Sequence, residues 1–261
     1  MILATVRAVL ALGVVWQAVI AGVWQSELPM AAEGPLAVVR AVAVRLDPSR
    51  VRFTLDRASR DYGLSGDWSI DRLPSTGAVA FNAGQFAGGA PWGWLVRDGA
   101  ESQPPGVGTL GMAFVVDAAG QASLLMPAEL TAARARARLA FQSYPALLVG
   151  GELPWELRAP GRGVNLAHRD SRLAIGVHAD GSVVVVLTRF VGMGPAAETF
   201  PWGPTVLEMA AFMKALGCDR AMLLDGGLSG QLALRKGDGS VERWSNWRAV
   251  PLGLVVAPRA P

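Results

Sequence analysis

The chain has 261 residues, of which 51% are hydrophobic and 17% are charged, and its formal net charge is only +3. This length suits one good-sized domain with a real core, or two small ones. The small charge excess, without a basic stripe interleaved with aromatics, argues against a nucleic-acid-binding protein. The single cysteine, Cys218, allows no intramolecular disulfide, and with only two histidines a His/Cys zinc site is not expected. No pattern in the sequence identifies a metal or a cofactor.

The N-terminal segment is apolar from Ala8 to Trp24 and carries one charge, Arg7, ahead of that run. A retained membrane anchor needs about 20 apolar residues, whereas a cleaved signal peptide needs small residues before the cut. No clean A-x-A cleavage site stands out, so we favour an apolar helical anchor over 1–25, followed by a linker over 26–35 and one domain over 36–261. Because Arg7 lies on the starting side, the domain is expected outside the cytoplasm, on the periplasmic side, whether anchored or secreted.

The domain itself is expected to be rich in strands. β-Branched runs with partial alternation, buried apolar runs and the turns DAAG and ADGS indicate strands and hairpins. The segments that carry these patterns, in chain order, are 36–47, 51–56, 78–86, 90–99, 111–126, 144–152, 171–190, 221–227, 230–239 and 247–256.

Two helices are expected between these strands. Pro127 can open the first, and AELTAARARARLAF continues it to residue 141. Pro204 can start the second, in which apolar residues recur at three- and four-residue steps, and Gly217 supplies a left-handed stop. Many strands with few helices predict an α+β fold, a mixed strand-rich domain with a few helices packed on the sheet.

Four stretches stand in a fixed order: FNAGQF, YPALLVGGE, SRLAIGVHADG and LGCDRAMLLDGGLSG. An Asp-Gly-Gly after a strand is by itself typical of a turn. Together, in this order, the stretches resemble the phosphodiester glycosidase domain family, whose pattern is approximately N-A-G-F-F, P-x-L-V-x-x-G, R-T-A-x-G and N-L-D-G-G-G-S. The resemblance covers about 36–256 and implies hydrolysis of a phosphodiester-linked sugar.

The resemblance also marks positions of this sequence. The matches are Asn82, Ala83, Gly84 and Phe86 in the first motif, Arg172, Ala174 and Gly176 in the third, Asp225, Gly226, Gly227 and Ser229 in the fourth, and Arg248 near the last strand.

Four positions depart from the family pattern. Gln85 replaces an aromatic residue and Leu173 replaces a threonine. Leu223 replaces an asparagine, and Leu228 replaces the third glycine of the last motif. Two polar positions beside the expected site have therefore become leucine.

The chemistry of the reaction suggests roles for the matched residues. A carboxylate, Asp225, can stabilise or attack the oxocarbenium-like sugar centre. An arginine, Arg172, can hold a pair of phosphate oxygens, and Asn82 suits a hydroxyl or phosphate contact. The substrate-binding positions that complete the expected site are Gly84, Gly226, Gly227, Ser229 and Arg248.

A second carboxylate usually handles the proton in such reactions. Asp170, Glu152 and Glu198 are available, but no motif selects one of them.

Two functions remain open at this point. The first is an extracytoplasmic phosphodiester glycosidase-like hydrolase acting on a phosphorylated glycan or another sugar–phosphate conjugate. The alternative is a catalytically silent, membrane-anchored domain of the same fold, serving as an accessory or structural subunit of a membrane protein complex; Leu173 and Leu223 favour it. The test is spatial, namely whether Asn82, Arg172 and Asp225 meet in one open, polar pocket.

Overall fold

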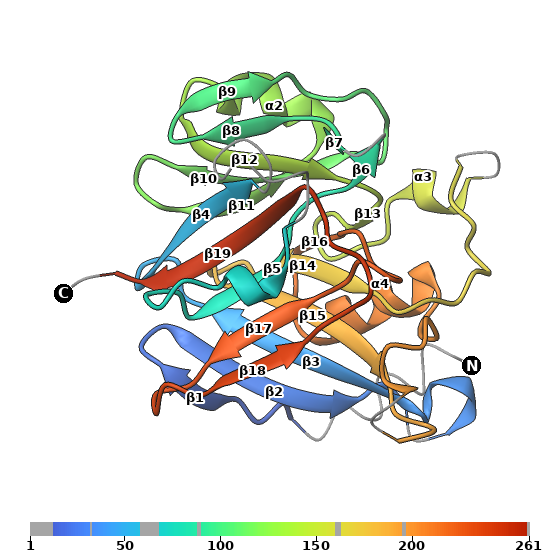
Figure 1. Cartoon of the computed structure of the whole chain (residues 1–261). Helices are drawn as coiled ribbons and strands as arrows, with labels where there is room; N and C mark the ends of the chain where they lie inside the picture. The colour runs from blue at the N-terminus through green and yellow to red at the C-terminus, as the bar shows by residue number, and fades with distance from the viewer. Residues whose placement is uncertain are drawn as a thin grey trace.

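A seven-stranded antiparallel sheet forms one side of the molecule in the computed structural model, which describes residues 13–31, 33–57, 68–87, 90–159, 163–194 and 197–259 (Figure 1). Its strand order is β1-β2-β3-β15-β14-β16-β13. The strands are β1 (Gln17–Ile20), β2 (Val23–Pro29), β3 (Val39–Leu46), β15 (Val183–Phe190), β14 (Leu173–Val177), β16 (Arg220–Leu223) and β13 (Ala146–Leu148).

Strands β1 and β2 correct the prediction for the N-terminal segment. β2 pairs with β3 from Val23↔Leu46 to Pro29↔Arg40, so the prediction of a helix reaching Trp24 is wrong, and 26–29 of the expected linker belong to a strand. Pairing with β3 gives the backbone N–H and C=O groups of β2 hydrogen-bond partners that a bilayer does not offer. The Gln25 side chain also has a polar partner, because it donates to Glu242 at 3.1 Å. The part of the expected anchor over 1–12 lies outside the described residues. Within the described ranges, no helix combines the length and the apolar character needed to cross a membrane.

Two five-stranded sheets and a small two-stranded one complete the strand framework. The first has the order β11-β10-β12-β8-β9, and its strands are β8 (Leu95–Arg97), β9 (Ala100–Gln103), β10 (Met112–Asp117), β11 (Ala122–Leu125) and β12 (Ala137–Ser143). The second has the order β18-β17-β5-β19-β4, and its strands are β4 (Val51–Arg57), β5 (Val79–Asn82), β17 (Leu232–Arg235), β18 (Val241–Trp244) and β19 (Leu252–Pro258). The two-stranded sheet joins β6 (Phe86–Ala87) and β7 (Ala90–Pro91).

The helices within the described residues are short. They are the 3-10 turns η1 (Gly34–Leu36) and η2 (Ile70–Arg72) and the α-helices α2 (Pro127–Ala133), α3 (Trp155–Arg158) and α4 (Val206–Ala215). Thr205 caps α4 by accepting from the Glu208 backbone N–H at 3.3 Å, and Gly217 follows the helix with φ of 89°. The strand-rich character with few helices agrees with the predicted class.

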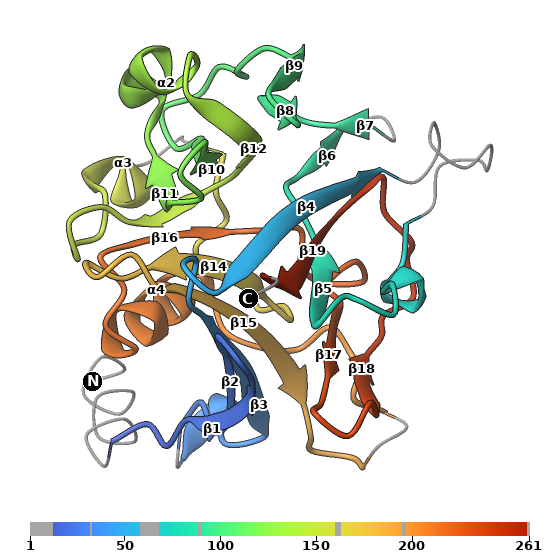
Figure 2. The ribbon, with the colours of Figure 1, turned by 90° about the vertical axis from the view of Figure 1, so that its left-hand side faces the viewer.

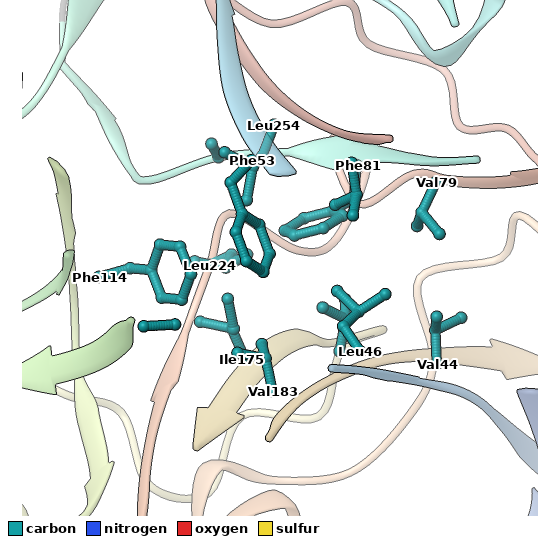
Figure 3. Packing of buried hydrophobic residues seen from close by; sticks show 14 of the residues in the cluster. Val44, Leu46, Phe53, Val79, Phe81, Phe114, Ile175, Val183, Leu224 and Leu254 are labelled. Carbon is teal, nitrogen blue, oxygen red and sulfur yellow. The ribbon is translucent and has the colours of Figure 1, made fainter. Parts of the chain in front are cut away.

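The main core lies where the three large sheets meet. Side chains from β3, β4, β5, β10, β14 and β19 fill it, and Figure 3 shows Phe53, Phe81, Phe114 and Ile175 among them. A second apolar cluster lies on the other face of the seven-stranded sheet, which α4 covers (Figure 2). Because both faces are covered, every residue of β15 is buried, which accounts for the apolar run from Val183 to Leu187.

The predicted hairpins are confirmed, and one predicted helix is too long. β10 pairs with β11 and β14 pairs with β15, each around the expected turn. The helix opened by Pro127 ends at Ala133, and 137–143 form strand β12 between β10 and β8. Leu139 and Phe141 alternate into the core there, so tertiary packing overrides the local helical preference.

Candidate active site

A pocket of about 250 Å³ lies where strands β14 and β16 meet the segment after β5. Its lining is Gln85, Tyr144, Pro145, Gly163, Val164, Asn165, His168, Asp170, Arg172, Val206, Leu223, Leu224, Asp225, Gly226 and Gly227. Antiparallel pairing places the start of β14 beside the end of β16, with Ala174 opposite Leu223. The Asp225 N–H then bonds the Gly84 carbonyl at 3.0 Å. Strand register therefore brings residues of all four sequence motifs to one point.

Asp225 lines this pocket from the loop after β16. The Ser229 hydroxyl donates a hydrogen bond to its carboxylate, and the positive charge of Arg248 also favours the ionised form. Burial nevertheless raises the pKa of the Asp225 carboxyl above its ordinary value of 3.8, and the nearby charge of Asp170 raises it further.

Asp170 is the second carboxylate, which no motif identified. Its Oδ2 lies 3.6 Å from Nε2 of His168, while its Oδ1 is buried without a hydrogen-bond partner among the described residues. Burial raises the pKa of the Asp170 carboxyl, although Arg172 and His168 act in the opposite direction. The only sequence signal was its position two residues before Arg172.

The other two carboxylates considered from the sequence have different surroundings. Glu152 is exposed and forms an ion pair with Lys214 at 2.6 Å. Glu198 lies 3.7 Å from the buried guanidinium of Arg189. Neither residue lines the pocket.

Arg172 is held in place by backbone carbonyls. Its Nε donates to the Pro204 carbonyl at 3.1 Å, and its Nη2 donates to the His168 carbonyl at 2.7 Å. Burial lowers the pKa of the guanidinium, and Asp170 beside it raises that pKa. Two carbonyl anchors thus orient a half-buried cation next to the carboxyl groups of the pocket.

Asn82 contributes to the site from behind the pocket lining. The side chain is fully buried; its Nδ2 donates to the Asp225 carbonyl at 2.7 Å, and its Oδ1 accepts from the Gln231 N–H at 3.0 Å. Asn82 therefore contacts the Asp225 loop through backbone groups, and it is absent from the pocket lining. Of the three residues expected to converge, Arg172 and Asp225 share the pocket, and Asn82 is a positioning residue for the second of them.

The glycines of the site permit close backbone approach. A Cβ on Gly226 would lie 2.6 Å from the Ser171 carbonyl oxygen, and one on Gly227, which has φ of +53°, would lie 2.8 Å from Oδ2 of Asp170. Both glycines line the pocket. The other expected substrate-binding residues are not part of the pocket lining: Gly84, Ser229 and Arg248.

The departures from the family pattern have different consequences. Leu173 is fully buried in the main core and does not reach the pocket lining. Leu223 does line the pocket, and so does Gln85, whose Nε2 donates to the Tyr144 carbonyl at 3.2 Å. Leu228 is 48% exposed on the Asp225 loop. Only Leu223 therefore puts an apolar surface in the pocket at a position that is polar in the family pattern.

No cluster of three or more His, Cys, Asp or Glu side chains is arranged to hold a metal ion in the part of the chain that the structure describes. The polar groups that line the pocket are carboxyl, guanidinium, imidazole, amide, phenol and backbone groups, and apolar side chains, among them Val206, Leu223 and Leu224, line it as well.

Replacing Asp170 with Asn tests the electrostatics of the pocket. Because the pKa of Asp170 is raised on folding, its neutral form stabilises the fold below the ordinary value of 3.8, and this contribution is lost as the pH rises through the folded pKa. Asn mimics the neutral form. Asp170→Asn should therefore raise the melting temperature at pH 7, and the gain should vanish below pH 3.8.

Asp180→Asn is the matched control because hydrogen bonds from Ser182 lower the pKa of Asp180. This variant should lose stability at pH 7 and approach the parent as the pH falls below 3.8. Thermal melts across this range decide the matter. A fall in melting temperature for Asp170→Asn at pH 7 would show that the Asp170 charge is stabilising.

Comparison with known proteins places this geometry in a family. The model of the phosphodiester glycosidase family matches residues 75–257. The chain belongs to this family. No curated protein sequence matches it.

Solved structures of low identity share the fold of this phosphodiester glycosidase domain. One is the zebrafish N-acetylglucosamine-1-phosphodiester alpha-N-acetylglucosaminidase catalytic domain, auto-inhibited by its pro-peptide, with 19% identity and a TM-score of 0.63 over 91% of this chain and 82% of that chain. A hypothetical protein from Synechocystis has 16% identity and a TM-score of 0.58, covering 92% and 62% of the two chains. An exported protein from Burkholderia pseudomallei K96243, whose assignment is provisional, has 16% identity and a TM-score of 0.60, covering 84% and 74%.

Proposed function

We propose that this protein hydrolyses the bond between a sugar and the phosphate of a phosphodiester. Water is consumed, and the products are the free sugar and a phosphate monoester of the alcohol. The observation that carries this proposal is the shared pocket of Asp170, Arg172 and Asp225 in a chain of the phosphodiester glycosidase family. Two carboxyl groups and one cation are the set that the reaction needs, because positive charge develops on the sugar and negative charge on the phosphate.

The two carboxyl groups suit different roles. Asp225 receives the Ser229 hydrogen bond and the field of Arg248, both of which favour its charged form. We assign Asp225 the role of the carboxylate that stabilises or attacks the sugar centre. Asp170 has an oxygen that is buried without a partner among the described residues, and its pKa is raised by burial. We assign Asp170 the role of the group that carries the proton transferred during the reaction.

Arg172 and the glycine loop complete the proposed arrangement. The guanidinium is oriented by the Pro204 and His168 carbonyls and can pair with phosphate oxygens. Gly226 and Gly227 lack side chains where the loop borders the pocket, so a substrate can approach their backbone.

We further propose that the substrate is a phosphorylated glycan or another sugar–phosphate conjugate and that the protein acts outside the cytoplasm. The location is supported by the apolar residues 8–16, which follow Arg7 and precede strand β1. Cell fractionation with periplasmic and cytoplasmic marker enzymes tests it, and recovery of the protein with the cytoplasmic marker would refute it.

Polar residues meet in the pocket, which favours the enzyme over a silent subunit.

The direct test is an activity assay on the purified chain. The panel starts from methyl N-acetylglucosamine 1-phosphodiester, the class named in the zebrafish enzyme, and adds glucose and galactose counterparts. We expect release of free sugar from at least one member. An active parent whose Arg172→Lys variant loses more than about tenfold in kcat/KM would support a paired phosphate contact. A parent that releases no sugar from any member would refute the proposal.

A further inference from the structure

Exposed apolar side chains stand on three segments that are connected to the pocket: the Asp225 loop, the segment between β18 and β19, and the loop before α4. Trp247 is 78% exposed, and Leu228 and Phe200 are each 48% exposed. Single exposed apolar residues are common on protein surfaces, but several on segments joined to one site call for an explanation. We call these three residues the apolar rim.

Hydrogen bonds connect the segment of Trp247 to the Asp225 loop, which carries Leu228. The Arg248 N–H bonds the Leu228 carbonyl at 3.0 Å, so Leu228 and Trp247 lie on paired segments. Asn246 donates from Nδ2 to the Gly230 carbonyl at 3.3 Å and also to the carbonyl of Gly227, a residue of the pocket lining. Leu228 is therefore one residue from the pocket, and Trp247 lies beside it.

Phe200, the third residue of the apolar rim, is connected to the pocket through Arg172. Phe200 belongs to the loop whose end carries the Pro204 carbonyl, the acceptor for Nε of Arg172. The buried guanidinium of Arg189 connects the segment of Trp247 to the loop of Phe200. It donates to the Ser245 carbonyl at 2.9 Å and lies 3.7 Å from Glu198. The rim loops thus have fixed positions relative to the pocket and to each other.

The size of the pocket indicates what the rim contacts. At about 250 Å³ the pocket is smaller than the roughly 300–1,000 Å³ typical of sites that enclose a ligand of drug size. The carboxyl and guanidinium groups of the lining suit the sugar and the phosphate, and the small volume leaves the alcohol side of a larger diester to extend past the mouth. Leu228 and Trp247 offer that alcohol an apolar surface.

We infer that the preferred substrate is a sugar phosphodiester of an apolar alcohol, whose hydrocarbon lies on the apolar rim. This inference rests on the proposed function and adds the class of the leaving group. Bond cleavage is unchanged: water supplies the hydroxyl of the free sugar, and the alcohol leaves as its phosphate monoester. Burial of hydrocarbon against Trp247 and Leu228 would favour long-chain substrates, since removing apolar surface from water is favourable and the gain grows with chain length.

The test compares methyl, butyl and decyl diesters of one sugar 1-phosphate, below the micellar concentration of the decyl ester. The parent should show a kcat/KM at least tenfold higher for the decyl than for the methyl ester. Trp247→Ala and Leu228→Ser should each bring that ratio close to one. Val15→Ala, which removes part of a 75% exposed side chain next to the outermost strand β1, should keep the parent ratio.

The outcomes separate this inference from the function on which it rests. A parent that hydrolyses all three esters at equal kcat/KM overturns the apolar-alcohol inference and leaves the proposed function in place. Rim variants that keep the parent ratio also overturn the inference. A parent that hydrolyses none of the esters refutes the proposed function. Melting temperatures of the rim variants establish that each is folded.

Discussion

Asp225→Asn is expected to lower kcat by roughly a thousandfold or more while leaving the melting temperature close to that of the parent. The amide keeps the size of the carboxylate and can still accept the Ser229 hydrogen bond. It cannot carry the negative charge needed beside a developing oxocarbenium ion. Because burial and Asp170 already disfavour the charge of Asp225 in the folded state, neutralising it should not weaken the fold.

Rate and stability should be measured on the same preparation. Asp238→Asn is the matched control, because Asp238 lies in the β17–β18 turn, where its Oδ1 accepts from the Ser240 N–H at 2.9 Å, and an amide oxygen can do the same. This control should keep the parent rate. An active Asp225→Asn variant would refute the catalytic assignment. The Asp-Gly-Gly segment would then have only the structural role of a turn.

Asn82→Ala is expected to cost about 2–6 kcal/mol of the free energy of unfolding. The substitution leaves the Asp225 carbonyl and the Gln231 N–H buried without their side-chain partner, and each such loss costs about 1–3 kcal/mol. Activity should fall as well, because the Asn82 amide fixes the backbone that carries the Asp225 carboxylate. Chemical denaturation at constant pH measures the first effect, and kcat measures the second.

Two comparison variants make this prediction specific. Asn165→Ala removes an exposed loop amide and should change stability by about 0.5 kcal/mol or less. Asn82→Asp keeps the acceptor for Gln231 but loses the donor to Asp225, so its stability should fall below that of the parent. An Asn82→Ala variant as stable as the parent would contradict the positioning role.

The sequence predicted the parts of the fold that local patterns determine. The β14–β15 hairpin follows from two apolar runs around ADGS, and α4 follows from its spacing and from Gly217. The N-terminal strands could not be predicted in this way, because apolar β2 residues alternate only weakly and their pairing with β3 is a long-range interaction.

The candidate site was predictable only where a motif marks it. Asp225 and Arg172 stand in matched motifs, and the pairing of β14 with β16 brings them to one pocket. Asp170 has no motif of its own, and its significance comes from burial that only the folded chain creates. The amide of Asn82 matched the family pattern, but whether it faces the substrate or the backbone depends on tertiary contacts.

The measurement that tests the central claim most directly is hydrolysis of the active diester in ¹⁸O-labelled water, followed by mass spectrometry of both products. Attack at the sugar carbon, assisted by Asp225 and Asp170, predicts one labelled oxygen in the free sugar and none in the phosphate monoester. In a parallel reaction, Asp225→Asn should form both products roughly a thousandfold more slowly, and the little free sugar that it forms should carry the same label. Label in the phosphate of the parent reaction would mean that the phosphorus–oxygen bond breaks, and it would contradict the glycosidase account.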